Sequence, residues 1–173
     1  MKKYILLILM AYSALILQST MLNSLQIGGV KPDLILVLVI CTAVICGPER
    51  GLGVGLLLGL AEDLYFGKFI GMNSLCKGLT ALIAGWFTAG TFSENLLVPV
   101  LSVFLGSIVN GALFFLVGLS MGMEWSVNIF FTAVLPRAFY NMCIVPFIYT
   151  PYHKFAQGLG DLQINFDLLK RDR

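Results

Sequence analysis

Residues 34–66 read LILVLVICTAVICGPERGLGVGLLLGLAEDLYF, two apolar runs separated by the tight polar turn Gly47-Pro48-Glu49-Arg50. The first run, 34–47, follows Pro32 and Asp33. Proline disfavours helix in the residue before it, and aspartate is a favoured N-cap, so a helix should begin at Leu34. With the second run, 51–66, the stretch predicts a helical hairpin. Counting residues leaves open whether each helix crosses a bilayer fully or is partly re-entrant.

The composition of the whole chain places this hairpin in a membrane. Of 173 residues, 58% are hydrophobic and only 12% are charged, and the mean hydropathy is +0.91. Soluble domains carry about a quarter charged residues, so this chain is too apolar to be one. A net charge of +2 without a basic stripe excludes intrinsic disorder and nucleic-acid binding. The chain is therefore predicted to be an all-α integral membrane protein.

Short polar segments separate the apolar runs and predict a six-helix transmembrane domain, residues 1–151, followed by a short cytoplasmic tail, residues 152–173. The predicted spans are 4–22, 34–47, 51–66, 72–92, 96–122 and 127–151. If the N-terminus is inside, seven Lys or Arg residues fall in inner segments, namely Lys2, Lys3, Arg50, Lys154, Lys170, Arg171 and Arg173. Two fall in outer loops, Lys31 and Lys68. Basic residues favour the cytoplasmic side, so both termini are predicted to be cytoplasmic.

Residues suited to catalysis or metal binding are scarce. The single histidine, His153, follows the last span, and no zinc, phosphate-loop or dinucleotide motif is present. We interpret the four cysteines as small buried apolar residues. The sequence therefore predicts no enzyme activity, no cofactor and no metal, although an intramembrane hydrolase stays as a minor alternative.

Glycines mark one face of the third predicted helix. Gly51, Gly55 and Gly59 recur every fourth residue, and residues four apart lie on one face of a helix. Small residues let helix backbones approach closely in membranes. The face is predicted to pack against a neighbouring helix of this chain, with a partner's helix as the alternative.

Two carboxylates follow this glycine face. Asp63 continues it, whereas Glu62 points elsewhere and reaches the interface in the simplest reading. Since polar residues within a membrane are costly and often functional, Asp63 is expected either to cap the next helix or to pair with Lys77. The last predicted helix carries Arg137 and Asn141 on one face, just after Pro136, and Asn110 could bond across a helix pair. These residues are predicted either to pack within the bundle or to contact a partner or ligand.

An ordered set of motifs resembles the MreD family of rod shape-determining membrane proteins. In chain order the motifs are Lys31-Pro32-Asp33, Gly47-Pro48-Glu49-Arg50-Gly51, the glycine series that ends at Asp63-Leu64, Gly71-x-Asn73-x-Leu75, and Asn141 followed by Pro146. The total length and the six-span layout are similar as well. Each motif alone is common, and the ordered set over residues 31–75 is more specific.

The resemblance implies a non-enzymatic scaffold in the bacterial cytoplasmic (inner) membrane. Such proteins bind the single-pass protein MreC within a complex that includes MreB, RodA and a class B penicillin-binding protein. They help to couple MreB filaments to peptidoglycan synthesis and cell shape. The implied fold resembles the six-helix substrate-binding components of ECF vitamin transporters, and fold does not fix function. The alternative function is therefore that of such a component or of another small transporter. Whether the chain forms a homodimer is left open.

Overall fold

The computed structural model describes residues 13, 16–18, 29–66, 69–90, 96–123, 128 and 130–171, with the backbone alone for residues 66, 130 and 154–171. The elements are α2 (Leu34–Cys46), α3 (Pro48–Phe66), α4 (Met72–Thr88), α5 (Leu97–Ser120), the π-helix η1 (Phe130–Val134) and α6 (Leu135–Arg171). Ser13 and residues 16–18 are helical too. The predicted all-helical fold is confirmed for the described residues.

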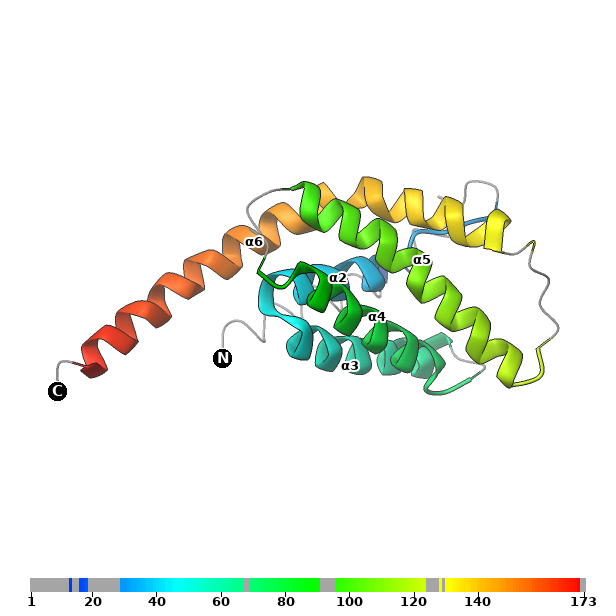
Figure 1. Cartoon of the computed structure of the whole chain (residues 1–173), viewed down its shortest axis with the longest axis horizontal. Coiled ribbons are helices and arrows are strands. Elements are labelled where there is room, and N and C mark those ends of the chain that lie inside the picture. The colour runs from blue at the N-terminus through cyan, green and yellow to red at the C-terminus, as the bar shows by residue number, and fades with distance from the viewer. Residues whose placement is uncertain are drawn as a thin grey trace.

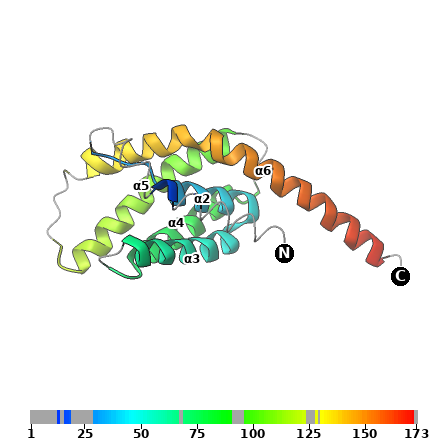
Figure 2. The ribbon, with the colours of Figure 1, turned by 180° about the vertical axis from the view of Figure 1, so that it is seen from behind.

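Helix α2 lies at the centre of the bundle (Figure 1). It contacts α3, α4, α5 and α6, and residues 35–43 are buried on every face. A helix that is apolar all round is expected to be enclosed in this way. Around α2, the most extensive packing joins α3 to α4. Helix α6 lies on the opposite side, and α5 starts beside α6 and crosses the bundle obliquely, as the reverse view also shows (Figure 2).

The core consists of apolar side chains from α2 and its neighbours. One cluster joins Val37 and Ile40 of α2 to Val103 of α5 and Val145 of α6. A second cluster joins Ile35, Val39 and Ala43 of α2 to Ala81 of α4. Large apolar side chains such as Leu57, Phe87 and Phe147 are exposed on the outside of the bundle, where a bilayer would cover them.

Among the described residues, two helices are long and apolar enough to cross a membrane, within Leu97–Ser120 and Phe131–His153. Helix α2 is apolar but shorter, at 13 residues. Helix α3 has 19 residues and carries Glu49, Arg50, Glu62 and Asp63. The number of membrane crossings predicted from the sequence therefore stays a prediction.

The helix bounds differ from several of the predicted spans. Helix α3 begins at Pro48, where a turn was expected up to Arg50, because proline has a φ suited to the first turn and needs no N–H there. The last helix continues past Pro151 to Arg171, where a tail was expected, and projects from the bundle (Figure 1). The predicted first span, 4–22, lies mostly outside the described residues.

A short π-helix precedes α6. Pro136 has no N–H to donate to the preceding turn, and the wider turns of η1 end just before it, at Val134. Val134 fits against Gly111 of α5, where a Cβ would come within 2.4 Å of the valine side chain. The glycine therefore lets the irregular end of the last helix pack closely on α5.

The four cysteines are free. Cys41 and Cys76 are buried, as interpreted, and Cys46 is half-buried. The interpretation is wrong for Cys143, which is exposed on α6. Cys143 therefore lies on the outer surface of the bundle and does not contribute to its packed core.

Candidate functional site

A fully buried lysine lies at the centre of the polar residues. The Lys77 side chain on α4 is 0% exposed. Its ammonium donates to Asp33 Oδ1 at 2.8 Å and to Glu62 Oε2. An unpaired charge in an apolar interior would cost several kcal/mol, roughly, so a buried ammonium needs such acceptors. The expectation that Glu62 reaches the interface is wrong, because its side chain is buried against Lys77.

Further hydrogen bonds extend this cluster. Gln18 Nε2 donates to Glu62 Oε1 at 3.0 Å. On the other side, the backbone N–H of Asp33 donates to Asn141 Oδ1 at 2.8 Å, and Asn141 Nδ2 donates to Ser107 Oγ at 2.9 Å. We call the connected set Gln18, Glu62, Lys77, Asp33, Asn141 and Ser107 the polar network. It joins one side chain from the N-terminal helical residues, α3, α4, α5 and α6 to the start of α2.

Asp63 serves a different purpose from its neighbour Glu62. Its carboxylate accepts the backbone N–H groups of Gly71, Asn73 and Ser74 at 2.9, 3.2 and 3.1 Å. The Asn73 side-chain amide adds a fourth bond, at 2.8 Å. The N-terminus of a helix leaves such N–H groups without partners and carries a partial positive charge. Of the two expectations for Asp63, the capping of the next helix is therefore confirmed, and Lys77 pairs elsewhere.

The glycine face of α3 is covered within the chain. A Cβ on Gly55 would lie 2.9 Å from Gly78 Cα, and one on Gly59 would lie 2.5 Å from Ser74 Cα, both on α4. A Cβ on Gly51 would lie 2.4 Å from the Ala43 side chain of α2. The glycines thus allow the close α3–α4 and α3–α2 contacts, so helices of this chain occupy the face.

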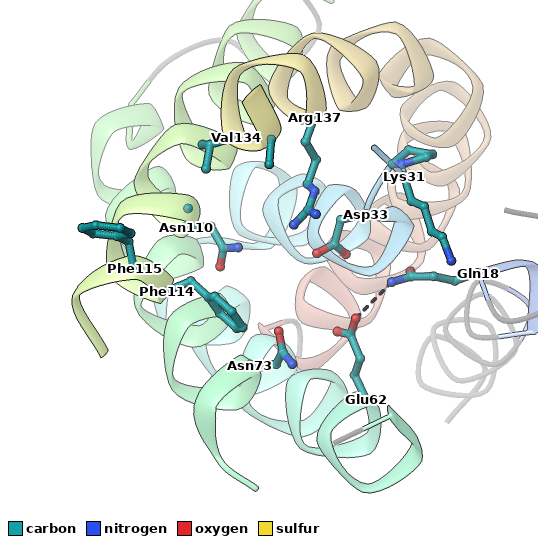
Figure 3. A pocket seen from close by; sticks show the side chains of 13 residues that line it. Gln18, Lys31, Asp33, Glu62, Asn73, Asn110, Phe114, Phe115, Val134 and Arg137 are labelled. Carbon is teal, nitrogen blue, oxygen red and sulfur yellow. Dashed lines mark hydrogen bonds between the residues drawn. The ribbon is translucent and has the colours of Figure 1, made fainter. Parts of the chain in front are cut away.

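A cavity of about 330 Å³ opens beside the polar network. It lies at the end of the bundle where α3 ends and α2, α4 and α6 begin. Its lining residues are Gln18, Lys31, Pro32, Asp33, Glu62, Asn73, Asn110, Gly111, Phe114, Phe115, Ala133, Val134 and Arg137. In Figure 3 the side chains of Asp33, Glu62, Asn73, Asn110 and Arg137 point toward one common space. The cavity therefore combines these polar groups with a larger apolar lining, which includes the aromatic residues Phe114 and Phe115 of α5.

Three groups of this cavity have hydrogen-bonding capacity left over, namely the side-chain oxygens of Gln18 and Asn110 and the guanidinium of Arg137. Asn110 is only 7% exposed, and its side-chain oxygen accepts no hydrogen bond from the described residues. The expectation that Asn110 bonds across a helix pair is thus wrong for that oxygen. The exposed guanidinium of Arg137 likewise donates no hydrogen bond within the described part of the chain, although it acts electrostatically on Asp33. An unsatisfied buried polar atom calls for an explanation, such as a bound group.

Asp33 carries a negative charge beside this cavity. Burial alone would raise the pKa of Asp33, but the nearby ammonium of Lys77 and the N–H of Leu36 hold this pKa below its ordinary value. The guanidinium of Arg137 lowers the same pKa further. The Leu36 N–H donates to Asp33 Oδ1 at 2.8 Å, which confirms Asp33 as the N-cap of α2.

The sequence identified part of this site. Asn141 joins the polar network, Arg137 lines the cavity, and Asp63 caps the start of α4. The roles of Lys77 and Glu62 were missed. The signal for them was a lysine at the start of an apolar run, which must find a carboxylate if the run is buried. Within the described residues, no group of three His, Cys, Asp or Glu side chains could hold a metal ion.

The family assignment comes from a match over nearly the whole chain. A family model described as rod shape-determining protein MreD matches residues 1–159 of 173. The chain belongs to the MreD family. The resemblance seen in residues 31–75 is thereby confirmed. MreD proteins are membrane proteins of the MreBCD system, and they take part in determining rod shape. Searches among curated proteins and among solved structures find no match.

Proposed function

We propose that this MreD-family chain is a non-enzymatic scaffold of the rod complex that binds the single-pass protein MreC. By holding MreC, it helps to couple MreB filaments to RodA and a class B penicillin-binding protein during peptidoglycan synthesis. Family membership supports a role in rod shape determination. The observation that favours partner binding is the cavity, where Asn110 and Arg137 offer groups that the described chain leaves unused.

The packing of α3 supports the cavity as the place where MreC binds. Association of helices in lipid depends on close packing and a few hydrogen bonds. The glycine face, which offers the closest packing, is already covered by α4 and α2. The cavity instead combines unused polar groups with the aromatic side chains of Phe114 and Phe115. A membrane-proximal segment of MreC would therefore find its best contacts there.

The proposed orientation puts this cavity on the outer side of the cytoplasmic membrane. The bias of basic residues favours cytoplasmic termini and six crossings. The segments before α2, between α3 and α4, and before α6 then face outward, and the cavity lies among them. MreC would enter it from the side of the membrane on which peptidoglycan is built.

The test is complementation of a rod-shaped host that lacks its own MreD, with recovery of MreC from solubilised membranes. Asn110→Phe should fill the cavity and reduce MreC recovery by about ten-fold or more, with rounded cells, since hydrogen bonding and space are lost together. The control is Leu105→Phe, which places the same ring on the exposed side of α5. Rod-shaped cells with full MreC recovery from Asn110→Phe would refute the cavity as the MreC site.

A second candidate function rests on the same cavity. Its volume of about 330 Å³ and its polar and aromatic lining also suit a small ligand, as in the substrate-binding component of a vitamin transporter. Purification from native membranes distinguishes the two functions. A bound vitamin or a co-purified ATPase module, without MreC, would favour the transporter.

A further inference from the structure

The charged groups around the cavity are engaged to different degrees. Asp33, Glu62 and Arg137 line it, and Lys77 lies directly behind Asp33 and Glu62, bound to both. The buried ammonium thus holds both carboxylates through hydrogen bonds, whereas the Arg137 side chain points from α6 into the cavity (Figure 3). Of these groups, Arg137 is the one whose donors can bind a ligand, and such a ligand has to offer an anionic acceptor.

The chemistry of Arg137 narrows the kind of anion. A guanidinium presents five N–H donors in a planar fork, and it binds carboxylates and phosphates through two parallel hydrogen bonds. Arg137 donates none within the described part of the chain, and its side chain points from α6 into the cavity (Figure 3). A carboxylate or phosphate would fill this fork without displacing any bond of the polar network.

Asn110 adds a second requirement. Its side-chain oxygen is buried and unpaired, so an occupant must donate a hydrogen bond to it as well as accept one from Arg137. A fully ionised phosphate or a simple carboxylate ion offers acceptors only. A peptide segment with an acidic side chain offers both, since its backbone N–H groups can donate. The aromatic wall of Phe114 and Phe115 would contact an apolar neighbour of that acidic residue.

We propose that the cavity recognises an aspartate or glutamate of the partner's membrane-proximal segment, whose carboxylate binds Arg137 while a nearby N–H group binds Asn110. The proposal rests on the proposed function, because it names the feature by which the partner is recognised. Lys77 acts behind this contact as a positioning residue. By engaging Asp33 and Glu62, it leaves Arg137 available to a carboxylate from outside the chain.

The test is a charge-reversal suppressor screen with the full-length chain in the complementation host. Arg137→Glu should lower partner recovery by about ten-fold or more, because it sets like charges against each other. Arg137→Lys keeps the charge but lacks the planar fork of donors, so partner recovery should fall only about two- to five-fold. Arg50→Glu, on the opposite end of α3, is the matched charge control and should bind like wild type. Membrane level and unfolding temperature are recorded for each variant.

A library that changes each acidic residue of the partner's outer membrane-proximal segment to lysine or arginine is then screened for rescue of Arg137→Glu. Rescue by one such change would establish the carboxylate contact. No rescue, with Arg137→Glu binding the partner as well as wild type, would overturn this inference. If Asn110→Phe still abolishes binding in that case, the cavity stays the partner site and only the acidic contact fails.

A lipid phosphate as the true ligand has its own signature. Recovery of wild type and of Arg137→Glu is compared in nanodiscs of neutral lipid and of lipid with anionic phosphoglycerol headgroups. If the loss in Arg137→Glu appears only with the anionic lipid, and no partner change rescues it, the proposed contact is wrong. An equal loss in both lipids, together with rescue, supports the acidic side chain.

Discussion

Replacing Lys77 with methionine is the sharpest test of the polar network. Methionine has similar length and no charge, so Lys77→Met leaves packing nearly intact. It removes the ammonium that holds Asp33 and Glu62. Both residues are buried, at 8% and 7% exposure for Asp33 and Glu62, so solvent compensates their charges only weakly. The variant therefore places two buried acids together without their shared counter-ion.

The expected loss follows from the number of partners left. Asp33 keeps the Leu36 N–H and the field of Arg137, whereas Glu62 keeps Gln18 alone among the residues that the structure describes. Removing one member of a buried ion pair costs about 3–5 kcal/mol. We expect Lys77→Met to lie in this range, with Glu62 as the poorer compensated acid. The measurement is the unfolding free energy of the purified protein in mixed micelles, followed by denaturant titration.

A double variant separates lost charge compensation from lost packing. Lys77→Met with Glu62→Gln removes the second charge while Gln18 can still hydrogen-bond at position 62. It should recover about half of the loss, because one carboxylate stays compensated by the Leu36 N–H. If Lys77→Met unfolds like wild type, or if the double variant is less stable than the single one, the ion pairs do not stabilise the fold as argued.

Three further outcomes are expected. Gly59→Ala should cost about 1–3 kcal/mol in the same titration, because its Cβ would meet Ser74 Cα at 2.5 Å, whereas Gly53→Ala, which meets nothing within 4 Å, should be neutral or slightly stabilising. Asp63→Ala should cost about 2 kcal/mol, at the upper end for a helix cap, and equal stability would refute the cap. In a chain without its native cysteines, Glu94→Cys should label from the cytoplasm and Glu124→Cys from outside; labelling from one side would refute the topology.

Local patterns in the sequence predicted the parts of the fold that depend on local geometry. Asp33 before an apolar run predicted a cap, and the capping bond is present. The four-residue spacing of Gly55 and Gly59 predicted a close helix contact, because this spacing places residues on one face. Pro48 as a first helical residue was missed. The rule that favours proline in the first turn would have predicted it.

The centre of the site could not be read from local patterns. Lys77 is 44 residues from Asp33 and 15 residues from Glu62, so its partners depend on how three helices come together. The sequence placed Lys77 near the start of a span and offered Asp63 as its possible partner, with capping of the next helix as the other role for Asp63. Two neighbouring carboxylates, Glu62 and Asp63, point in different directions along α3. Only the packed bundle shows that one binds Lys77 and the other caps α4.

The polar contacts of α2 explain why such an apolar bundle contains a charged network. Helix α2 is apolar on every face, so burial alone would favour many rotations and shifts of this helix nearly equally. Polar contacts favour one of these positions of α2 over the others. At one end Asp33 binds Lys77 and Asn141, and at the other the Thr42 hydroxyl lies 3.3 Å from the Tyr152 phenol oxygen. We infer that these contacts fix α2 in one register, as single polar residues do in coiled coils. Because Asp33 also lines the cavity, the interactions that fix the central helix also shape the proposed partner site.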